Sequence, residues 1–226
     1  MLKFLSQLLD LIYKKRCYCC KSTKENSYLC SKCYKSIKQF SYNSLEVING
    51  VKVYSATVYK NNVQKIIRGL KYHKQRELSV YLAKFMYEYW KNLEISKQQF
   101  IIVPVPISAK RMKERHYNHM SLVAKEFAKL TGYEINENLI IRVKDTKPQY
   151  KLNKTERAKN LKGAFEAVKE NFETITEKNI LIFDDILTTG STIAEITKIF
   201  QKNGTHKLTA FTTSCSEYNL HANNIF

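Results

Sequence analysis

The segment from Ile180 to Thr192 constrains the fold of this chain more strongly than any other. It opens with four consecutive apolar residues, continues with two adjacent acids, and ends in a hydroxyl-rich turn that leads into an apolar-periodic stretch. A short apolar run bounded by polar residues predicts a strand buried on both faces, as in a parallel sheet. The segment therefore predicts one strand–turn–helix unit of an α/β protein.

Further apolar runs extend this unit into a sheet. Strands are expected at residues 50–60, 100–105, 139–143, 179–184 and 208–212, and helices at residues 63–70, 78–90, 122–130 and 192–200. This alternation predicts βαβ units, and hence a parallel, Rossmann-like α/β sheet with helices on both faces. The lysine-rich residues 144–162 have few apolar anchors and predict a long loop.

The two acids, Asp184 and Asp185, lie at the predicted carboxyl end of their strand, where open α/β sheets bind ligands. The turn that follows consists of Thr188, Thr189, Gly190, Ser191 and Thr192. Hydroxyls and backbone N–H groups at a helix N-terminus form an anion site, and two converging carboxylates suit the vicinal hydroxyls of a ribose. The alternative is a plain turn capped by Ser and Thr, with the acids as ordinary turn residues.

The N-terminal 45 residues differ in composition from the rest, which predicts a small module (1–45) before a larger domain (46–226). Residues 1–13 are expected to form an amphipathic helix rather than a signal peptide, because polar residues interrupt their apolar core. The sequence contains no apolar run near the ~18 residues of a membrane span. We therefore expect a soluble, cytoplasmic protein that is not membrane-spanning and whose thiols are reduced.

Two C-x-x-C pairs lie in the N-terminal module. They are formed by Cys17, Cys20, Cys30 and Cys33. Four thiolates at this spacing suit a tetrahedral, closed, structural zinc site, which would supply the stability that some thirty residues cannot draw from a core. Two alternatives stay open: Cys19 replaces Cys17 or Cys20 as a ligand, or all the thiols are free. Lys21 stands where such knuckles usually carry Gly, and Cys215 is expected to be a buried apolar residue.

The charge of the chain is strongly uneven. The formal net charge is +18, and the first 160 residues carry 32 basic and 12 acidic side chains, against six and eight in the remainder. This excess indicates a polyanionic partner, either nucleic acid or a phosphorylated ligand, although a generally basic proteome would give the same total. Aromatic residues interleave with the basic ones, as in proteins that stack bases of single-stranded nucleic acid.

The segment Ile180–Thr192 resembles the phosphoribosyl-pyrophosphate motif of type I phosphoribosyltransferases. That resemblance implies the type I phosphoribosyltransferase fold, with Asp184 and Asp185 on the ribose hydroxyls and the turn Thr188–Thr192 around the 5′-phosphate. It also implies that Mg²⁺ accompanies phosphoribosyl pyrophosphate. No catalytic acid or nucleophile is predicted, because in such a transfer the protein mainly positions charge.

Further segments resemble the ComF (ComFC) competence family. Val103-Pro-Val-Pro106 is followed by Arg111 and by Arg115-His-Tyr-Asn118, which is similar to that family's P-V-P…R…R-G-F-N stretch. A second similar pattern starts at Arg142, passes through Gln149, Leu152, Arg157 and Asn160, and ends at Gly163-Ala-Phe165. The four-cysteine module also fits, whereas His116 departs from the family, which usually has Gly there.

The ComF resemblance implies a competence factor for natural transformation that handles incoming DNA and binds single-stranded DNA. The expected DNA contacts are Lys71, Lys74, Arg76, Arg111 and Arg115. The main alternative is a cytoplasmic phosphoribosyltransferase that acts on an unidentified small acceptor. A third is an adaptor whose zinc module docks a DNA helicase or translocase. Whether transferase turnover occurs is left open.

Overall fold

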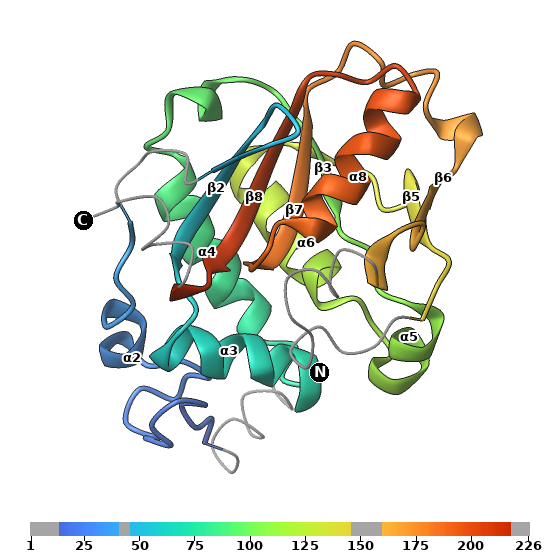
Figure 1. Cartoon of the computed structure of the whole chain (residues 1–226). Helices are drawn as coiled ribbons and strands as arrows, with labels where there is room; N and C mark the ends of the chain where they lie inside the picture. Colours follow the sequence, from blue (N-terminus) through green and yellow to red (C-terminus); the bar gives the residue numbers. More distant parts are fainter. Residues whose placement is uncertain (1–13, 41–45, 146–159, 218–226) are drawn as a thin grey trace, which may run out of the picture.

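The computed structural model describes residues 14–40, 46–145 and 160–217, and these form a layered α/β structure (Figure 1). In spatial order the main sheet consists of β1 (Glu46–Ile48), β2 (Val51–Val58), β8 (Leu208–Cys215), β7 (Ile180–Leu187), β3 (Ile101–Pro104) and β4 (Glu134–Ile135). Only the β1–β2 pair is antiparallel, and the other four pairs are parallel. The predicted, mostly parallel α/β sheet is therefore confirmed.

Helices cover both faces of this sheet, as right-handed crossovers require. The helices are α2 (Ser31–Lys35), α3 (Asn61–Tyr72), α4 (Leu78–Trp90), α5 (Ala109–Arg115), α6 (His119–Thr131) and α8 (Ser191–Lys202), with short 3₁₀ turns η1 (Glu94–Lys97) and η3 (Lys169–Asn171). Figure 1 shows α8 in front of the sheet and α4 and α6 behind it. Each lies where periodicity predicted a helix, except the short α2 and α5, which were not predicted.

Side chains of the central strand separate into two cores because successive residues of a strand face opposite sides. Leu181 and Phe183 pack with α3, α4 and α6, together with Trp90 and Phe127. Ile180 and Ile182 pack on the other face against α8. Both faces of β7 are therefore buried, as its unbroken apolar run predicts.

One predicted strand of the parallel sheet lies elsewhere. Residues 139–143 contain β5 (Ile140–Arg142), which pairs antiparallel with β6 (Phe165–Ala167) in a separate two-stranded sheet. The place beside β3 is taken instead by the two-residue strand β4. The prediction was wrong because Ile141 and Val143 are 45% and 44% exposed, so this β-branched run buries one face only.

The central strand is also longer than predicted. β7 continues past Asp184 and Asp185 to Leu187, because its pairing with β8 extends to Leu187 and Cys215. On its other side the pairing with β3 stops at Pro104 and Phe183. The acids thus follow the strand's end only with respect to β3, and they stay within the strand with respect to β8.

The cysteine-containing segment packs on the main domain. Cys17, Leu29, Cys30 and Cys33 belong to the same apolar cluster as α3 and α4. The predicted boundary at residue 45, the helix at residues 1–13 and most of the loop at 144–162 fall outside the described residues, as do Gln149, Leu152 and Arg157. Within the described ranges, every helix is too short or too polar to cross a bilayer.

Candidate functional site

Asp184 and Asp185 leave the central strand on opposite faces. Asp185 shares the face of Phe183, where α3 and α6 pack, and Asp184 shares the face of Ile182. Since β3 ends beside Phe183, both carboxyl groups lie at the edge that β3 vacates. The two side chains therefore start on opposite faces of the sheet at this edge, and the convergence of their carboxylates on one ligand stays a prediction.

Asp185 is held by two side chains of the chain itself. Its Oδ2 forms an ion pair with Lys71 Nζ at the end of α3 and accepts a hydrogen bond of 2.9 Å from His119 Nε2 at the start of α6. Asp185 is only 7% exposed. Burial alone would raise the pKa of Asp185, but the charge of Lys71 and the bond from His119 hold it far below its usual value. Asp185 is therefore a carboxylate at neutral pH.

Asp184 has the opposite tendency. Burial, followed by the charge of Asp185, raises the pKa of Asp184 to about 7, although its Oδ1 accepts the backbone N–H of Asp185 at 2.9 Å. Two neighbouring acids whose pKa values are shifted in opposite directions are typical of a functional site, because one acid is then ionised while the other can carry a proton.

The sequence prediction missed His119. Asn118 positions it: the Asn118 side chain caps α6 by accepting from Met120 N–H and donates to the carbonyl of Val105, at the end of β3. Burial lowers the pKa of His119 to about 4, so the neutral ring donates Nε2–H to Asp185, and its Nδ1 has no partner among the described residues. Topology could have indicated this residue. The segment after β3 begins at the carboxyl end of that strand, and Asp185 lies at the same edge of the sheet.

The predicted phosphate loop precedes α8. Gly190 has a left-handed backbone (φ +71°) as the residue before the helix, and Thr189 and Ser191 share a hydroxyl hydrogen bond of 2.8 Å. A Cβ at Gly190 would lie 2.3 Å from Ile48 Cδ1, because the β1–β2 hairpin rests on the loop. Only glycine satisfies both demands.

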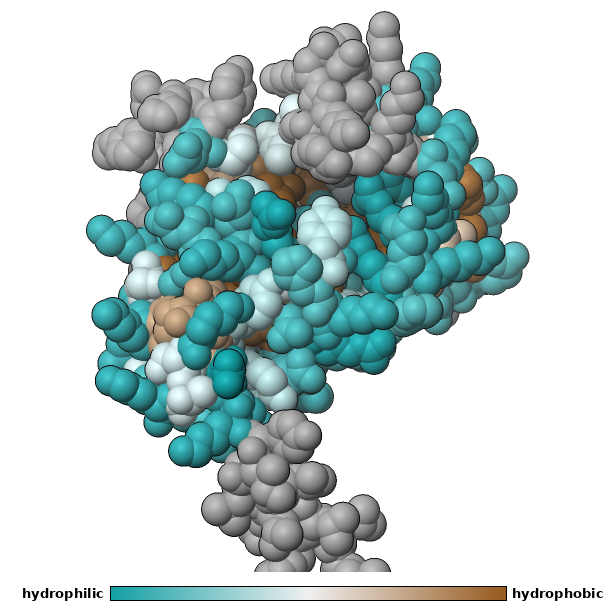
Figure 2. Space-filling view, turned by 90° about the horizontal axis from the view of Figure 1, so that it is seen from below, coloured by the Kyte–Doolittle hydropathy of each residue, from teal (hydrophilic) through white to brown (hydrophobic). Residues whose placement is uncertain are grey.

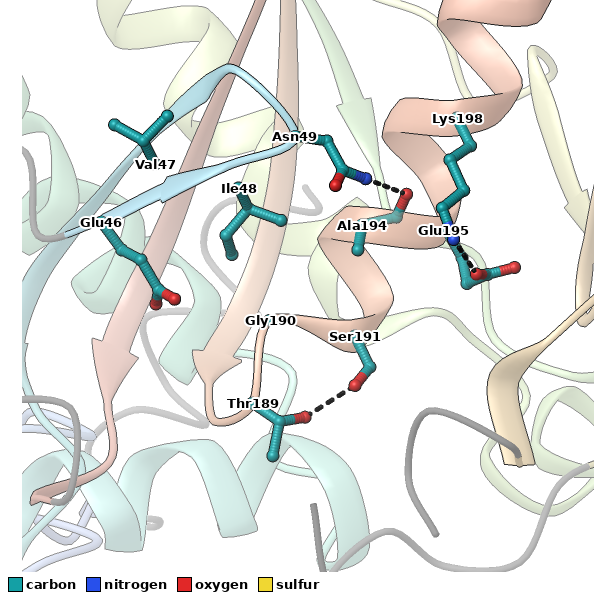
Figure 3. Close-up of a pocket in the computed structure, with 10 residues that line it drawn as sticks. All are labelled: Glu46, Val47, Ile48, Asn49, Thr189, Gly190, Ser191, Ala194, Glu195 and Lys198. Carbon is teal, nitrogen blue, oxygen red and sulfur yellow. Dashed lines mark hydrogen bonds and ion pairs between the residues drawn. The ribbon is translucent and has the colours of Figure 1, made fainter. Parts of the chain in front are cut away.

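A cleft of about 400 Å³ opens between that hairpin and α8 (Figure 3). It is lined by Thr189, Gly190 and Ser191 of the predicted site and by hairpin and α8 residues, including Glu46, Asn49, Glu195 and Lys198. Asn49 donates to the Ala194 carbonyl and thereby fixes the hairpin to the helix. The two acids, Thr188 and Thr192 are not part of this lining, so the cleft covers the hairpin side of the loop only.

Two arginines lie near enough to the acids to sense their charges, and Arg111 lies near both of these arginines. Burial lowers the pKa of Arg115, which also senses the charges of Arg111 and Asp185. Burial lowers the pKa of Arg142 to about 10; the charge of Arg111 lowers it further, and that of Asp184 opposes this. Guanidinium groups gathered at a half-buried site repel one another, and such an arrangement suits an anionic ligand with several phosphates.

The predicted DNA contacts lie around the same edge. Lys71 is 18% exposed in its pair with Asp185, the Arg115 guanidinium lies 5.2 Å from the ring centre of Tyr72, and Arg76 lies 4.5 Å from that of Tyr117. Tyr117 in turn donates to the Leu70 carbonyl at the end of α3. Lys74 is exposed beyond that helix. Figure 2, which looks up at the α3 and α5 side, shows hydrophilic residues over most of this face.

The four predicted metal ligands come together. The Sγ atoms of Cys17, Cys20, Cys30 and Cys33 all lie within 4.8 Å of one another, which fits the donor set of a tetrahedral zinc ion. Cys19 is buried but stands outside this group of the described residues, so the alternative in which Cys19 is a ligand is not supported. Cys215 is fully buried, as predicted for an apolar residue.

Six non-glycine residues of the described chain have a positive φ, and two of them bear on the predicted motifs. Lys21, after the first knuckle, has φ +65°, and its N–H closes the turn on the Cys17 carbonyl at 2.8 Å. His116, the residue that departs from the ComF pattern, ends α5 with φ +65°. The loop that carries Arg115 therefore keeps a left-handed turn despite the missing glycine, at a cost in backbone strain.

Comparison with known proteins finds relatives of this chain. Competence protein F of Haemophilus influenzae is 28% identical over 196 residues, which cover 84% of this chain and 81% of that protein. The resemblance to the ComF family is confirmed. DNA utilization protein YhgH of Salmonella typhimurium is 28% identical over 156 residues, which cover 68% of this chain and 67% of that protein. No protein-family model matches the chain.

Solved structures similar to this ComF-like chain are phosphoribosyltransferases. A hypoxanthine phosphoribosyltransferase from Staphylococcus aureus has 18% identity and a TM-score of 0.37, over 61% of this chain and less than two thirds (65%) of that enzyme. An adenine phosphoribosyl transferase from Trypanosoma brucei has 13% identity and a TM-score of 0.38, over 83% and 79%. The fold assignment rests on the strand order described above and not on these two enzymes.

Proposed function

We propose that this protein acts in DNA uptake, binds single-stranded DNA and carries a site for phosphoribosyl pyrophosphate with Mg²⁺. The observation that carries the proposal is the edge beside β3, where two acids, a glycine-containing loop before α8 and several cations gather. Its similarity to a competence protein and to a DNA utilization protein supports the cellular role.

The acids and the loop supply complementary halves of the phosphoribosyl-pyrophosphate site. Carboxylate oxygens of Asp184 and Asp185 accept from ribose hydroxyls, and the N-terminus of α8 with the hydroxyls of residues 188–192 receives the 5′-phosphate. Mg²⁺ enters with the substrate and keeps several waters, as this ion prefers. The arginines beside the acids neutralise the pyrophosphate.

DNA binding is carried by the basic face below the same edge. If Lys71, Lys74, Arg76, Arg111 and Arg115 each contact one phosphate, the log–log salt slope of single-stranded DNA binding is about −3.5. Affinity then falls about a hundredfold between about 50 and 200 mM salt. Stacking on tyrosines such as Tyr72, which is 57% exposed, makes binding tolerant of sequence.

Parallel titrations test the proposal. Wild-type protein is titrated with phosphoribosyl pyrophosphate plus Mg²⁺ by calorimetry and with a labelled oligonucleotide by anisotropy. Asp184→Asn with Asp185→Asn is expected to abolish the first binding and to leave the second intact, because acids repel phosphates. Glu177→Gln, which alters an exposed acid paired with Lys207, is the matched control. Wild-type affinity of the double variant for phosphoribosyl pyrophosphate would contradict the site assignment.

A further inference from the structure

Aromatic and cationic side chains connect the cysteine knuckle to the end of α3. Tyr18 lies between two cysteines of the first knuckle, and Lys21 Nζ lies 4.7 Å from its ring centre. The Tyr18 hydroxyl is hydrogen-bonded to His73 Nδ1, with the two rings 6.1 Å apart. Gly69 permits this approach, since a Cβ there would lie 3.0 Å from the Tyr18 ring.

The consecutive residues Lys71, Tyr72 and His73 lead from this contact to the acid pair. Tyr72, next to His73, is exposed and lies beneath the guanidinium of Arg115. Lys71, the preceding residue, is the ion-pair partner of Asp185. We call the row Lys21, Tyr18, His73, Tyr72, Arg115 and Lys71 the aromatic strip. It begins at the metal module and ends at the proposed ribose site.

The inner end of the strip serves both proposed ligands. Lys71 contacts Asp185 directly, and Arg115 is close enough to Asp185 and Arg111 to sense both charges. A pyrophosphate bound beside the acids and a DNA phosphate bound on the strip would need these same cations. Two polyanions that share their counter-charges repel each other, and in a half-buried site that repulsion is weakly screened.

We propose that single-stranded DNA and phosphoribosyl pyrophosphate share the inner end of the aromatic strip and exclude one another. This inference rests on the proposed function and adds its regulation: the protein releases the DNA segment at this edge when phosphoribosyl pyrophosphate with Mg²⁺ binds. The alternative is two independent sites on a generally basic surface. The ion pair between a predicted DNA contact, Lys71, and a predicted ribose ligand, Asp185, favours one shared site.

Competition at constant ionic strength tests the inference. A labelled oligothymidylate is bound to the full chain, and its dissociation constant is measured with and without saturating phosphoribosyl pyrophosphate and Mg²⁺. We expect at least a tenfold weakening with phosphoribosyl pyrophosphate and a smaller one with ribose 5-phosphate, which lacks the pyrophosphate. Mg²⁺ alone is the control for counterion effects. In the Asp184→Asn/Asp185→Asn variant the weakening should vanish while DNA still binds.

The outer end of the strip separates the two ligands. Tyr18→Ala should weaken DNA binding about 5- to 150-fold, the range for loss of one stacked base, and leave phosphoribosyl-pyrophosphate affinity unchanged. Tyr18→Phe keeps the ring and should bind DNA normally. Because Tyr18 adjoins the cysteines, metal content is measured, and Tyr72→Ala, at an exposed ring, repeats the test away from the module.

The outcomes distinguish the inference from the function beneath it. Unchanged or tighter DNA binding in phosphoribosyl pyrophosphate, with each ligand bound alone, overturns the shared site and leaves the proposed function standing. Unchanged DNA affinity in both Tyr18→Ala and Tyr72→Ala overturns the strip. Failure of wild-type protein to bind either ligand alone overturns the proposed function itself.

Discussion

The cysteine knuckles and the acid pair each bring groups of like charge together. The two regions differ in what balances the repulsion between these groups. Four thiols meet within 4.8 Å, and as thiolates they need a cation that the chain does not supply among them. Asp185 instead has Lys71 and His119 as partners from the chain's own helices. The first cluster is compatible with a metal ion that would balance its charge, whereas the second has its counter-charge within the chain.

This difference assigns different roles to the two regions. A closed four-thiolate site has no open position for a substrate and contributes to folding. The acid pair keeps one carboxyl group, Asp184, partly exposed and near its pKa at neutral pH, so it can change charge when a ligand or ion approaches. We therefore expect a structural role for the cysteine module, which packs on α3 and α4, and a binding role for the acid pair.

The largest expected effect concerns the metal. Cys20 is exposed and Cys19 is buried, so free thiols would make Cys20→Ala nearly neutral and Cys19→Ala worse by about 1 kcal/mol. A zinc site reverses this order, because structural zinc contributes of order 10 kcal/mol in small modules. We expect Cys20→Ala to lose zinc, measured by elemental analysis, and several kcal/mol of stability in the module.

Cys19→Ala is the matched control and should retain about one zinc per chain, as a tetrahedral four-cysteine site implies. Chelation of wild-type protein should mimic Cys20→Ala in thermal unfolding. If Cys19→Ala proves the more damaging substitution and no metal is found, the thiols are free, and the contrast between the two regions disappears.

A smaller effect is expected at the acid pair. Lys71→Met leaves the Asp185 carboxylate buried with only His119 as a partner, and breaking a buried ion pair on one side costs about 3 kcal/mol. Lys207→Met removes an ion pair of the same type that is exposed on both sides and should cost less than about 1 kcal/mol. Urea unfolding measures both changes.

Adding Asp185→Asn to Lys71→Met should recover part of that loss, because the orphaned charge is then gone. Equal effects of Lys71→Met and Lys207→Met would mean that the buried pair contributes no more than a surface pair. Lys71 would then not be the counter-charge that stabilises the acid pair.

The sequence predicted the parts that depend on local pattern. Apolar runs located β3, β7 and β8, and cysteine spacing located the four thiols, because each is a short-range regularity. It did not predict His119, since a histidine at a helix start has no local signature and acquires its partner only when α6 returns to β7. It misplaced residues 139–143 because exposure of one strand face depends on neighbours distant in the chain.

A pH series sharpens the description of Asp184. The pKa of Asp184 is about 7 in the folded protein, against an ordinary value of 3.8. The folded state therefore favours the protonated carboxyl group, and ionisation of this group destabilises the fold. Stability from Asp184 is therefore fully present below about pH 4 and is lost as pH rises through 7. Asp184→Asn should stabilise the protein relative to wild type, with a difference that grows between about pH 5 and 7 at no more than about 1.4 kcal/mol per pH unit.

That experiment compares variant with wild type at each pH because His119 acts in the opposite direction. Its folded pKa, lowered by burial to about 4, makes stability rise with pH over part of the same range. The contribution of His119 cancels in the difference. A difference that is independent of pH would show that Asp184 is ionised throughout and carries no raised pKa.

The smallest expected effect compares the backbones of the two regions. Lys21 in the first knuckle and His116 before α6 both have φ +65°, a conformation that costs a residue with a Cβ about 1 kcal/mol relative to glycine. Lys21→Gly and His116→Gly should each be about 1 kcal/mol more stable than the matched Lys21→Ala and His116→Ala, which remove the side chain and keep the strain.

If the metal holds the knuckle, removing zinc should abolish the advantage at Lys21, because the turn then unfolds with the module. The advantage at His116 should survive chelation, since His116 ends α5 and lies outside the cysteine module. Thermal unfolding of the four variants with and without chelator measures both terms, and equal sensitivity to chelator at both positions would show that the two regions fold as one unit.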